Sequence, residues 1–209
     1  MTQTIQAKDT DLRYLIDKFG IQLVLDDSLF PEWQENLPGI NDLDKQLLDK
    51  VKTGYLNLLN YPPLLKDIVR MAVVDPLLFI GDFYLAPFYV KSEKSIDIAV
   101  PDEDVIIKGR IDTLVLKEQF WVMIIESKRA SFSIKEGLAQ IIAYMLGNPY
   151  TDKPNFGMIA TGSEFIFVKL VKGNPPRYAL SKGFLMRNPG NELYEVLRIL
   201  KHLTRLASA

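Results

Sequence analysis

Three ionisable residues, Asp112, Glu126 and Lys128, accompany two apolar runs: Asp112 lies within residues 105–116, and Glu126 and Lys128 follow residues 119–125. The runs are rich in β-branched and aromatic residues and flank a short polar turn, which predicts a β-hairpin. Charges at the end of a buried hairpin need compensation, because an unpaired buried charge costs several kcal/mol. Two carboxylates on adjacent strands can bind Mg²⁺, which prefers oxygen ligands and keeps several waters. A lysine beside them can orient an attacking water or help to deprotonate it, so the pattern points to metal-dependent hydrolysis.

The alternation of side chains along the two predicted strands indicates on which face each ionisable residue lies. Side chains alternate between the faces of a strand, so Asp112 is expected on the same face as Lys108 and Arg110. In the second strand, Glu126 and Lys128 share a face. Apolar side chains precede them on both faces: Phe120, Val122 and Ile124 on the face of Glu126, and Trp121, Met123 and Ile125 on the other. This strand is therefore expected to be buried on both sides.

A structural cluster of ion pairs would use the same residue types as a metal site. Structural pairs are common and metal sites are not, so Asp112, Glu126 and Lys128 alone leave both interpretations open. A purely structural cluster predicts that these three residues pair with one another and that Gln140 points elsewhere.

The segment after the hairpin predicts a helix over residues 133–146. Ser133 and Glu136 have the spacing of a capping box, and Gly147-Asn148-Pro149 is a stop signal. Glu136, Gln140 and Tyr144 fall at i, i+4 and i+8, on one face. Apolar residues fill much of the remaining surface: Leu138, Ile141, Ile142 and Met145. A polar stripe on such a packed helix indicates that the helix faces something polar.

Together these residues carry a resemblance to a known family. Asp112, a gap of 13 residues and then Glu126-Ser127-Lys128 resemble the signature of the PD-(D/E)XK nuclease superfamily. Gln140-x-x-x-Tyr144 is similar to the QxxxY motif of the subgroup that includes the nuclease domains of RecB-type enzymes and type I restriction R subunits. The order strand, turn, strand, capped helix adds to the resemblance. Ile111 stands where the family name has proline, at a position that varies in the superfamily.

The resemblance implies an α/β (α+β) fold with a restriction-endonuclease-like core, in which helices flank a central mixed β-sheet. It implies a Mg²⁺-dependent deoxyribonuclease, with Mn²⁺ able to substitute, and a catalytic set of Asp112, Glu126, Lys128, Gln140 and Tyr144. Asp112, Glu126 and the backbone carbonyl of Ser127 would hold the metal, while Gln140 and Tyr144 would orient the lysine and metal or the scissile phosphate. Many relatives add an acidic residue from an earlier helix, for which Asp75 and Asp82 are candidates.

The 209 residues suffice for one α/β domain with a substantial core. We expect residues 1–80 to form a mainly helical region packed on a nuclease-like core of residues 81–209, probably as one structural unit. Helices are predicted at 11–19, 41–59, 64–74 and 192–206, and further strands at 84–90, 95–100, 156–161, 164–171 and 178–180.

Several classes of protein are disfavoured by composition. The chain has no cysteine, which excludes disulfide bonds and metal sites built from thiolates. A metal bound through oxygen ligands is therefore favoured. The lack of cysteine is also compatible with the cytoplasm, where we expect the protein. Neither a signal peptide nor a membrane span is apparent, so no membrane partner is expected. A phosphate-binding G-x-x-x-x-G-K-[ST] loop is also absent, so a translocating motor is not on this chain.

Charge is divided unevenly along the chain. Residues 1–104 hold ten Lys/Arg and eighteen Asp/Glu, whereas residues 105–209 hold fifteen and eight. The basic half would attract a phosphate backbone. The basic residues nearest the proposed site, and hence the candidate DNA contacts, are Lys108, Arg110, Arg129 and Lys135.

These observations favour a nuclease that acts on DNA. The alternative, from a different class, is a non-catalytic DNA-binding or assembly subunit that uses the nuclease fold. The acidic first half and the lack of a motor are compatible with a homodimer or with partners in a restriction-type complex.

Overall fold

The computed structural model describes residues 3–26, 28–63, 65–101, 103–128, 134–150, 153 and 155–207; within these ranges the side chains of Phe120, Lys135 and Glu136 are not described. Ser133, the predicted cap of the site helix, and Arg129, a predicted DNA contact, lie outside the described residues.

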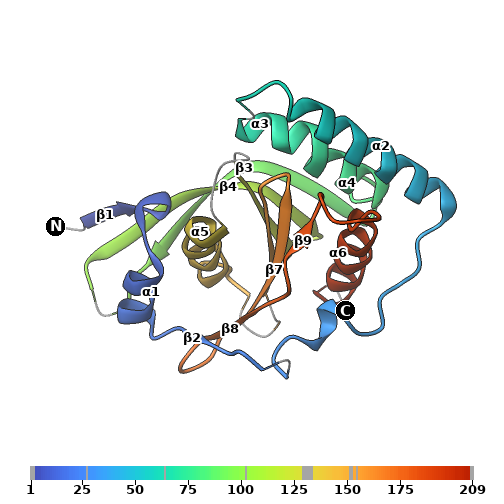
Figure 1. The fold of residues 1–209 in the computed structure, drawn as a ribbon. Helices are drawn as coiled ribbons and strands as arrows, with labels where there is room; N and C mark the ends of the chain where they lie inside the picture. Colours follow the sequence, from blue (N-terminus) through green and yellow to red (C-terminus); the bar gives the residue numbers. More distant parts are fainter. Residues whose placement is uncertain are drawn as a thin grey trace.

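Nine strands of the described chain form one mixed sheet (Figure 1). The order along its main path is β1 (Gln3–Gln6), β4 (Val105–Lys117), β5 (Phe120–Ser127), β6 (Asn155–Ala160), β7 (Glu164–Val171), β8 (Arg177–Leu180) and β2 (Gln22–Leu23). In addition, β3 (Phe88–Ala99) pairs with β4 and β9 (Phe184–Leu185) pairs with β7. The pairs β1/β4, β5/β6 and β2/β8 are parallel and the others antiparallel. The expected mixed sheet is thus present.

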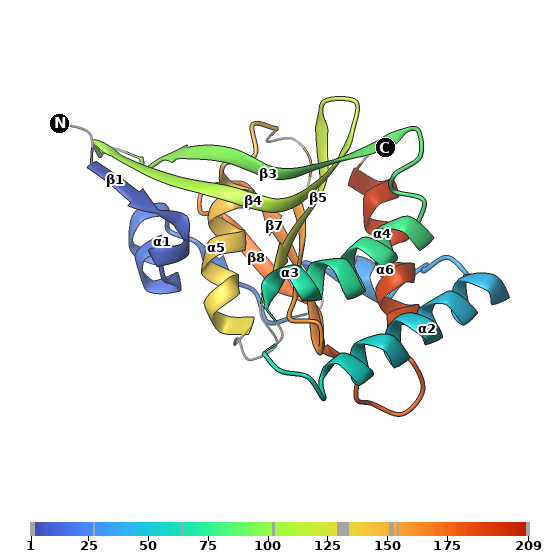
Figure 2. The same ribbon diagram turned by 90° about the horizontal axis from the view of Figure 1, so that it is seen from above.

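Helices cover this sheet in two groups (Figure 2). On one side, α5 (Ile134–Leu146) packs on the strands and on α1 (Leu12–Phe19). On the other side, α6 (Leu193–Ala207) packs on β5 and β6 together with α2 (Asp42–Leu58), and α3 (Lys66–Val69) and α4 (Asp75–Ile80) complete that layer. Two separate clusters of buried apolar side chains fill the spaces between the sheet and these groups.

The connection β5–α5–β6 positions the helix that carries the predicted polar stripe. Parallel strands need a crossover, and here α5 supplies it. Every residue of β6 is buried, and Ile141, Ile142 and Met145 of α5 are fully buried against this part of the sheet. The polar face of α5 is thereby fixed over the middle of β4 and the end of β5.

Most of the elements predicted from the sequence are confirmed. The hairpin β4/β5, the hairpin β6/β7, strand β8 and helices α1, α2, α5 and α6 begin and end within two residues of the predicted bounds. Local capping explains two of the helix starts: Asp11 accepts a hydrogen bond from the Tyr14 N–H, and Asn41 accepts one from the Asp44 N–H. In the described residues, no helix combines the length and apolar character needed to cross a membrane.

The predicted helix over 64–74 is longer than expected. It runs from Lys66 through a π-helical segment, Arg70–Val74, into α4, which ends at Ile80. Pro76 was expected to lie beyond the helix, but it occupies the first turn of α4. Proline is tolerated in the first turn of a helix, where its missing N–H is not needed, so the helical segment continues through Pro76.

The break predicted between strands at 84–90 and 95–100 was wrong, and so was the start of the first strand. Residues 84–87 form turns, and a single strand, β3, pairs with β4 from Phe88 to Ala99. The residues between the two predicted strands are polar and show no apolar alternation, and in the structure their side chains are largely exposed. Backbone pairing with β4 sustains the strand there, although Glu93 adopts a left-handed conformation with φ 54°.

The predicted faces of β5 also need a correction. The register of β4 and β5 shifts between Val115 and Leu116, which marks a β-bulge. Val122 consequently joins Met123 and Ile125 in one apolar cluster, while Trp121 packs with Ile124 in the other. The extra residue of a bulge breaks the strict alternation on which the prediction relied. Burial of β5 on both faces is confirmed.

Candidate active site

The site begins where β4 and β5 separate. Thr113 and Ile125 form the last ladder pair of the hairpin, and Asp112 lies just beyond it. The Ser127 N–H donates to Asp112 Oδ2 across a distance of 3.0 Å. Asp112 is buried, and this bond fixes one of its two carboxylate oxygens to the strand that carries Glu126.

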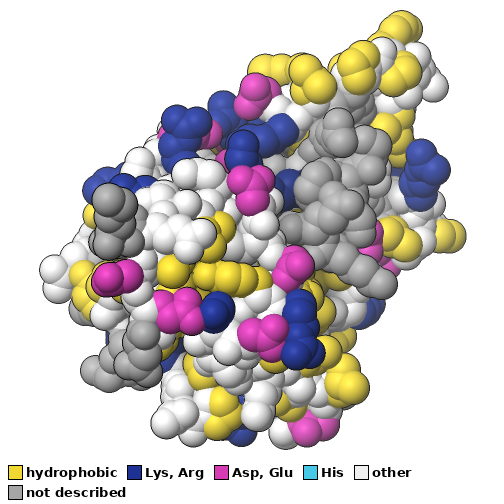
Figure 3. Space-filling view, turned by 90° about the vertical axis from the view of Figure 1, so that its left-hand side faces the viewer, with side chains coloured by type: hydrophobic (Ala, Val, Ile, Leu, Met, Phe, Trp, Pro, Cys, Tyr) yellow, Lys and Arg dark blue, Asp and Glu magenta, His cyan; other side chains and the backbone are white. Residues whose placement is uncertain are grey.

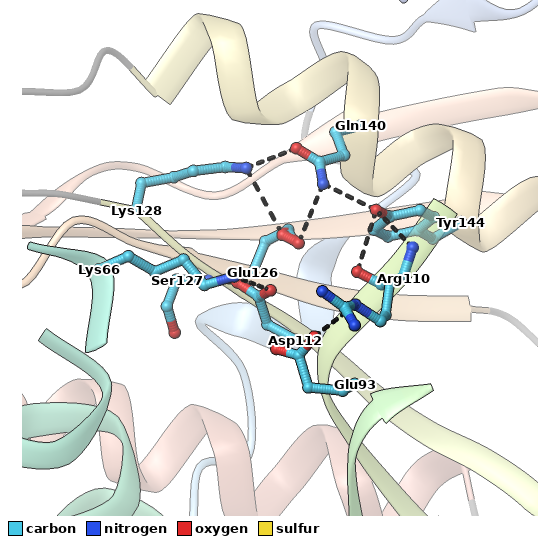
Figure 4. A network of polar contacts seen from close by, with 9 residues as sticks. All are labelled: Lys66, Glu93, Arg110, Asp112, Glu126, Ser127, Lys128, Gln140 and Tyr144. Atoms are coloured by element: carbon cyan, nitrogen blue, oxygen red, sulfur yellow. Dashed lines mark hydrogen bonds and ion pairs between the residues drawn. The ribbon is translucent and has the colours of Figure 1, made fainter. Parts of the chain in front are cut away.

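Gln140 connects the remaining predicted residues (Figure 4). Its Oε1 accepts a hydrogen bond from Lys128 Nζ at 2.5 Å. Its Nε2 donates to Glu126 Oε1 at 3.2 Å and to the Tyr144 hydroxyl at 2.7 Å. The figure shows the side chains of Lys128, Glu126 and Gln140 pointing toward one another. One amide thus holds the lysine, the carboxylate and the phenol in a fixed arrangement.

The structure brings all five predicted catalytic residues together. Asp112 comes from β4, Glu126 from the end of β5, Lys128 from the residue that follows β5, and Gln140 and Tyr144 from α5. A purely structural ion cluster predicted that Gln140 would point elsewhere, and that prediction is wrong. It also predicted that Asp112, Glu126 and Lys128 would pair with one another. Glu126 and Lys128 do form an ion pair, at 3.6 Å, whereas Asp112 pairs with Lys66.

Glu126 has an unusual electrostatic environment. Burial raises its pKa to about 8, and the charge of Asp112 adds to the effect, while Lys128 and Lys66 oppose it. Glu126 Oε2 is buried without a hydrogen-bond partner. Lys128 Nζ forms an ion pair with this oxygen at 3.6 Å, a longer separation than a well-formed hydrogen bond has. A buried acceptor that receives no hydrogen bond is costly, so a proton or a cation closer than the ammonium of Lys128 is favoured at this oxygen.

Tyr144 is held as a hydrogen-bond donor. Burial raises its pKa above the ordinary range, and the charge of Glu126 adds to the shift. The hydroxyl donates to the carbonyl of Arg110 at 3.2 Å and accepts from the Arg110 N–H at 3.3 Å. Tyr144 therefore ties the polar face of α5 to β4.

Lys66 is a member of the site that sequence reasoning missed. It is the first residue of α3, and its Nζ lies 2.5 Å from Asp112 Oδ1. Burial alone would lower the pKa of Lys66, but the hydrogen bond and charge of Asp112 outweigh this effect and raise it. No spacing pattern in the sequence marks this lysine, because its contact depends on how α3 packs against the sheet.

The acidic residue expected from an earlier helix is not Asp75 or Asp82. Asp75 bonds to the hydroxyl of Tyr84 and lines a separate cavity of about 300 Å³ with Arg70, and Asp82 lies in the turn after α4. Neither residue lines the cavity beside Asp112. The residue of α3 that contacts Asp112 is a lysine, Lys66.

A second missed residue is Glu93, on β3. The ladder pairs Ser92 with Thr113 and Lys94 with Ile111, so Glu93 stands opposite Asp112. Its carboxylate pairs with Arg110 Nε at 2.5 Å. The positive φ of Glu93 is uncommon for a residue with a side chain, and such strain gathers at functional sites.

A polar cavity of about 490 Å³ opens beside this site. Asp112, Gln140 and Tyr144 form its inner wall, and its basic lining residues are Lys8, Lys66, Lys108 and Arg110. Lys108 and Arg110, both predicted to contact DNA, thus reach the cavity, whereas the side chain of Lys135 lies outside the described part of the structure. Figure 3, which faces this end of the molecule, shows Lys and Arg side chains gathered beside acidic ones.

The residues present fit a hard divalent cation. Among the described residues, no three His, Cys, Asp or Glu side chains lie together as a ready-made metal cluster. Mg²⁺, however, is commonly bound through one or two carboxylates plus waters. Oε2 of Glu126, which accepts no hydrogen bond, and the neighbouring carboxylate of Asp112 could supply such a donor set.

Comparison with known proteins adds no assignment: no protein-family model matches this chain, and a search of curated proteins gives no match.

Proposed function

We propose that this protein is a Mg²⁺-dependent nuclease that hydrolyses DNA phosphodiester bonds and is built on a restriction-endonuclease-like core. The observation that carries the proposal is the position of Gln140, whose amide contacts both Lys128 and Glu126. A structural ion pair needs no such bridge, whereas a catalytic lysine must be held at a fixed distance from the metal ligands.

The metal would be held by Asp112, Glu126 and the backbone carbonyl of Ser127. When bound, the divalent cation supplies Lewis-acid polarisation of the phosphate and offsets its negative charge. The pKa of Glu126, raised to about 8, is consistent with a carboxylate that ionises fully only when a cation is beside it.

Each of the other residues has a distinct role in the hydrolysis. Lys128 positions the attacking water and stabilises the negative charge that develops on the phosphate as water adds in line and the opposite P–O bond breaks. Gln140 fixes the ammonium of Lys128, and Tyr144 fixes Gln140. Lys108 and Arg110 line the adjacent cavity and would attract the phosphate backbone.

A plasmid-cleavage assay with and without Mg²⁺ tests the proposal. Wild-type protein should cut plasmid DNA only when Mg²⁺ or Mn²⁺ is present, and Lys128→Ala should abolish cutting while the far-UV circular dichroism stays unchanged. Lys45→Ala is the matched control, because Lys45 is an exposed lysine on α2 that pairs with Asp42. Undiminished cutting by Lys128→Ala would remove this lysine from the mechanism.

One observation favours the alternative, a non-catalytic DNA-binding or assembly subunit. The ion pair between Lys66 and Asp112 already neutralises a carboxylate that the nuclease needs for its metal. Calorimetric titration of Mg²⁺ or Mn²⁺ into wild type and Asp112→Ala separates the two functions. A nuclease requires metal binding that is lost in the variant, whereas DNA binding without metal binding would support the alternative.

A further inference from the structure

Two lysines face the two carboxylates of the site, and they are held very differently. The side chain of Lys128 is only 13% exposed, and its ammonium bonds to Gln140. The side chain of Lys66 is 42% exposed and reaches Asp112 from a different layer of the fold. Lys66 is therefore the lysine that can leave the site without disrupting the network around Gln140.

The two oxygens of Asp112 are also unequal. Oδ2 accepts the backbone N–H of Ser127, a bond set by the geometry of the hairpin. Oδ1 is the oxygen left for a cation, and the ammonium of Lys66 lies 2.5 Å from it. The positive charge of an ammonium at this distance repels a divalent cation from the same oxygen, so the two compete.

We propose that Lys66 occupies the cation position on Asp112 in the metal-free protein and transfers to a phosphate of the bound DNA strand when a divalent cation binds. This inference rests on the proposed nuclease function and adds a substrate-binding residue to it. In both states the charge of Lys66 stays compensated, first by Asp112 and then by the phosphate. The bound cation takes over neutralisation of Asp112.

The cavity beside the site can receive the displaced side chain. Lys66 lines it together with Lys8, Lys108 and Arg110. Lys108 lies 3.8 Å from Asp97, and Arg110 pairs with Glu93, so these two basic groups already have acidic partners on β3. A released Lys66 is a mobile ammonium with three donors on a four-carbon stem, which suits a phosphate in this cavity. Cation binding and DNA binding are then coupled, each strengthening the other.

Two measurements test the proposal with neutral variants of Lys66. The first is calorimetric titration of Mn²⁺ into DNA-free protein, and the second is fluorescence anisotropy of labelled DNA with Ca²⁺ in place of Mg²⁺, at several salt concentrations. Lys66→Met should bind Mn²⁺ about fivefold more tightly, the size expected when a partly exposed competing ion pair is lost. It should bind DNA more weakly, with a salt slope smaller by about one, as for one lost phosphate contact.

Control variants separate competition from general electrostatics. Lys66→Arg keeps the charge and should behave like wild type in both assays, and Lys66→Gln provides a second neutral variant if Lys66→Met folds poorly. Lys108→Met removes a lysine of the same cavity that pairs with Asp97, so it should weaken DNA binding without tightening Mn²⁺ binding.

The outcomes distinguish this inference from the proposed function. If neutral Lys66 variants bind Mn²⁺ no more tightly than wild type, the competition is disproved, while metal-dependent cutting by wild type would still support the nuclease. If they bind Mn²⁺ more tightly but keep the wild-type DNA affinity and salt slope, the transfer to phosphate is disproved. If neither wild type nor the variants bind Mn²⁺, both proposals fail.

Discussion

The hydroxyl of Tyr144 bridges the backbone N–H and C=O of Arg110, at 3.3 and 3.2 Å. Strand β3 pairs along one edge of β4, so β1 and β5 must share the other. Pairing with β1 ends at Lys108 and pairing with β5 begins at Thr113. Arg110 lies between the segments of β4 that pair with β1 and with β5. On this edge, its backbone N–H and C=O therefore bond to the side chain of Tyr144 and not to a neighbouring strand. Tyr144 therefore has a structural task in addition to its place in the site.

Removing this hydroxyl should destabilise the fold. Tyr144→Phe leaves both backbone groups of Arg110 without this partner, so we expect the free energy of unfolding to fall by about 1–3 kcal/mol. Urea denaturation followed by circular dichroism measures the change. Tyr61→Phe, at a tyrosine that is 70% exposed, is the control and should have no effect. Equal stability of the two variants would show that water replaces the lost hydroxyl.

Gly109 is expected to tolerate no side chain. A Cβ at this position would lie 2.4 Å from Tyr144 Cε1 and 2.9 Å from the Cβ of Ala7. Gly109→Ala should therefore lower the free energy of unfolding by about 1–3 kcal/mol. Gly54→Ala is the matched control, because a Cβ there meets open space on helix α2, and it should stabilise the protein by up to about 1 kcal/mol.

A double-mutant cycle identifies the source of the Gly109 effect. If the clash with the ring is the cause, Gly109→Ala should cost less in a Tyr144→Ala background than in wild type. Additive costs would locate the strain elsewhere, for example at Ala7.

The stability of the metal-free protein should decrease as pH rises through neutrality. Because the pKa of Glu126 is raised from 4.5 to about 8, the folded protein holds a proton between these pH values that the unfolded chain has released. Linkage then requires the free energy of unfolding to fall with rising pH across this window. Denaturation at pH 5, 6, 7 and 8 in the presence of EDTA measures the slope.

Glu126→Gln supplies the comparison for this pH dependence. The amide cannot ionise, so the variant should lose less stability between pH 5 and pH 8 than wild type does. Parallel pH profiles for the two proteins would show that Glu126 ionises normally in the folded state.

Gln140→Ala should impair catalysis more than it impairs folding. The substitution removes the acceptor of Lys128 and a donor to Glu126, and loss of such supporting contacts typically lowers metal affinity or activity by about 10- to 100-fold. Cleavage rates at increasing Mn²⁺ concentrations measure both quantities. Gln6→Ala, which alters the same cavity from β1, should change the rate less than twofold, about the scatter of such assays. A similar rate for both variants would argue against the bridging role of Gln140.

Local signals in the sequence predicted the part of the site that lies between β4 and α5. Apolar runs on both sides of a turn indicated the hairpin. The i, i+4 spacing of Gln140 and Tyr144 placed both residues on one face of the helix. These features depend on residues that are close in the sequence, so they can be predicted from its periodicity. The same reasoning failed at β5, where a bulge near Val122 interrupts the alternation.

Contacts between distant segments could not be predicted in this way. Strand β1 has only four residues, and its pairing of Gln3 with Val105 spans half of the chain. The left-handed conformation of Glu93 has no signal in its residue type. Lys66 meets Asp112 only because α3 packs at one particular place on the sheet. Each of these contacts is a property of tertiary packing.

Because the first eighty residues contribute both a strand and a lysine to the surroundings of the site, recombination between this gene and that of a relative is constrained. Strand β1 borders β4, and Lys66 reaches Asp112, so both structure and charge at the site depend on pieces from the two sides of residue 80. A recombination crossover near that residue would combine β4 and Asp112 with the β1 strand and residue 66 of another protein. Substitutions at Lys66 and around Asp112 are consequently expected to be inherited as a set.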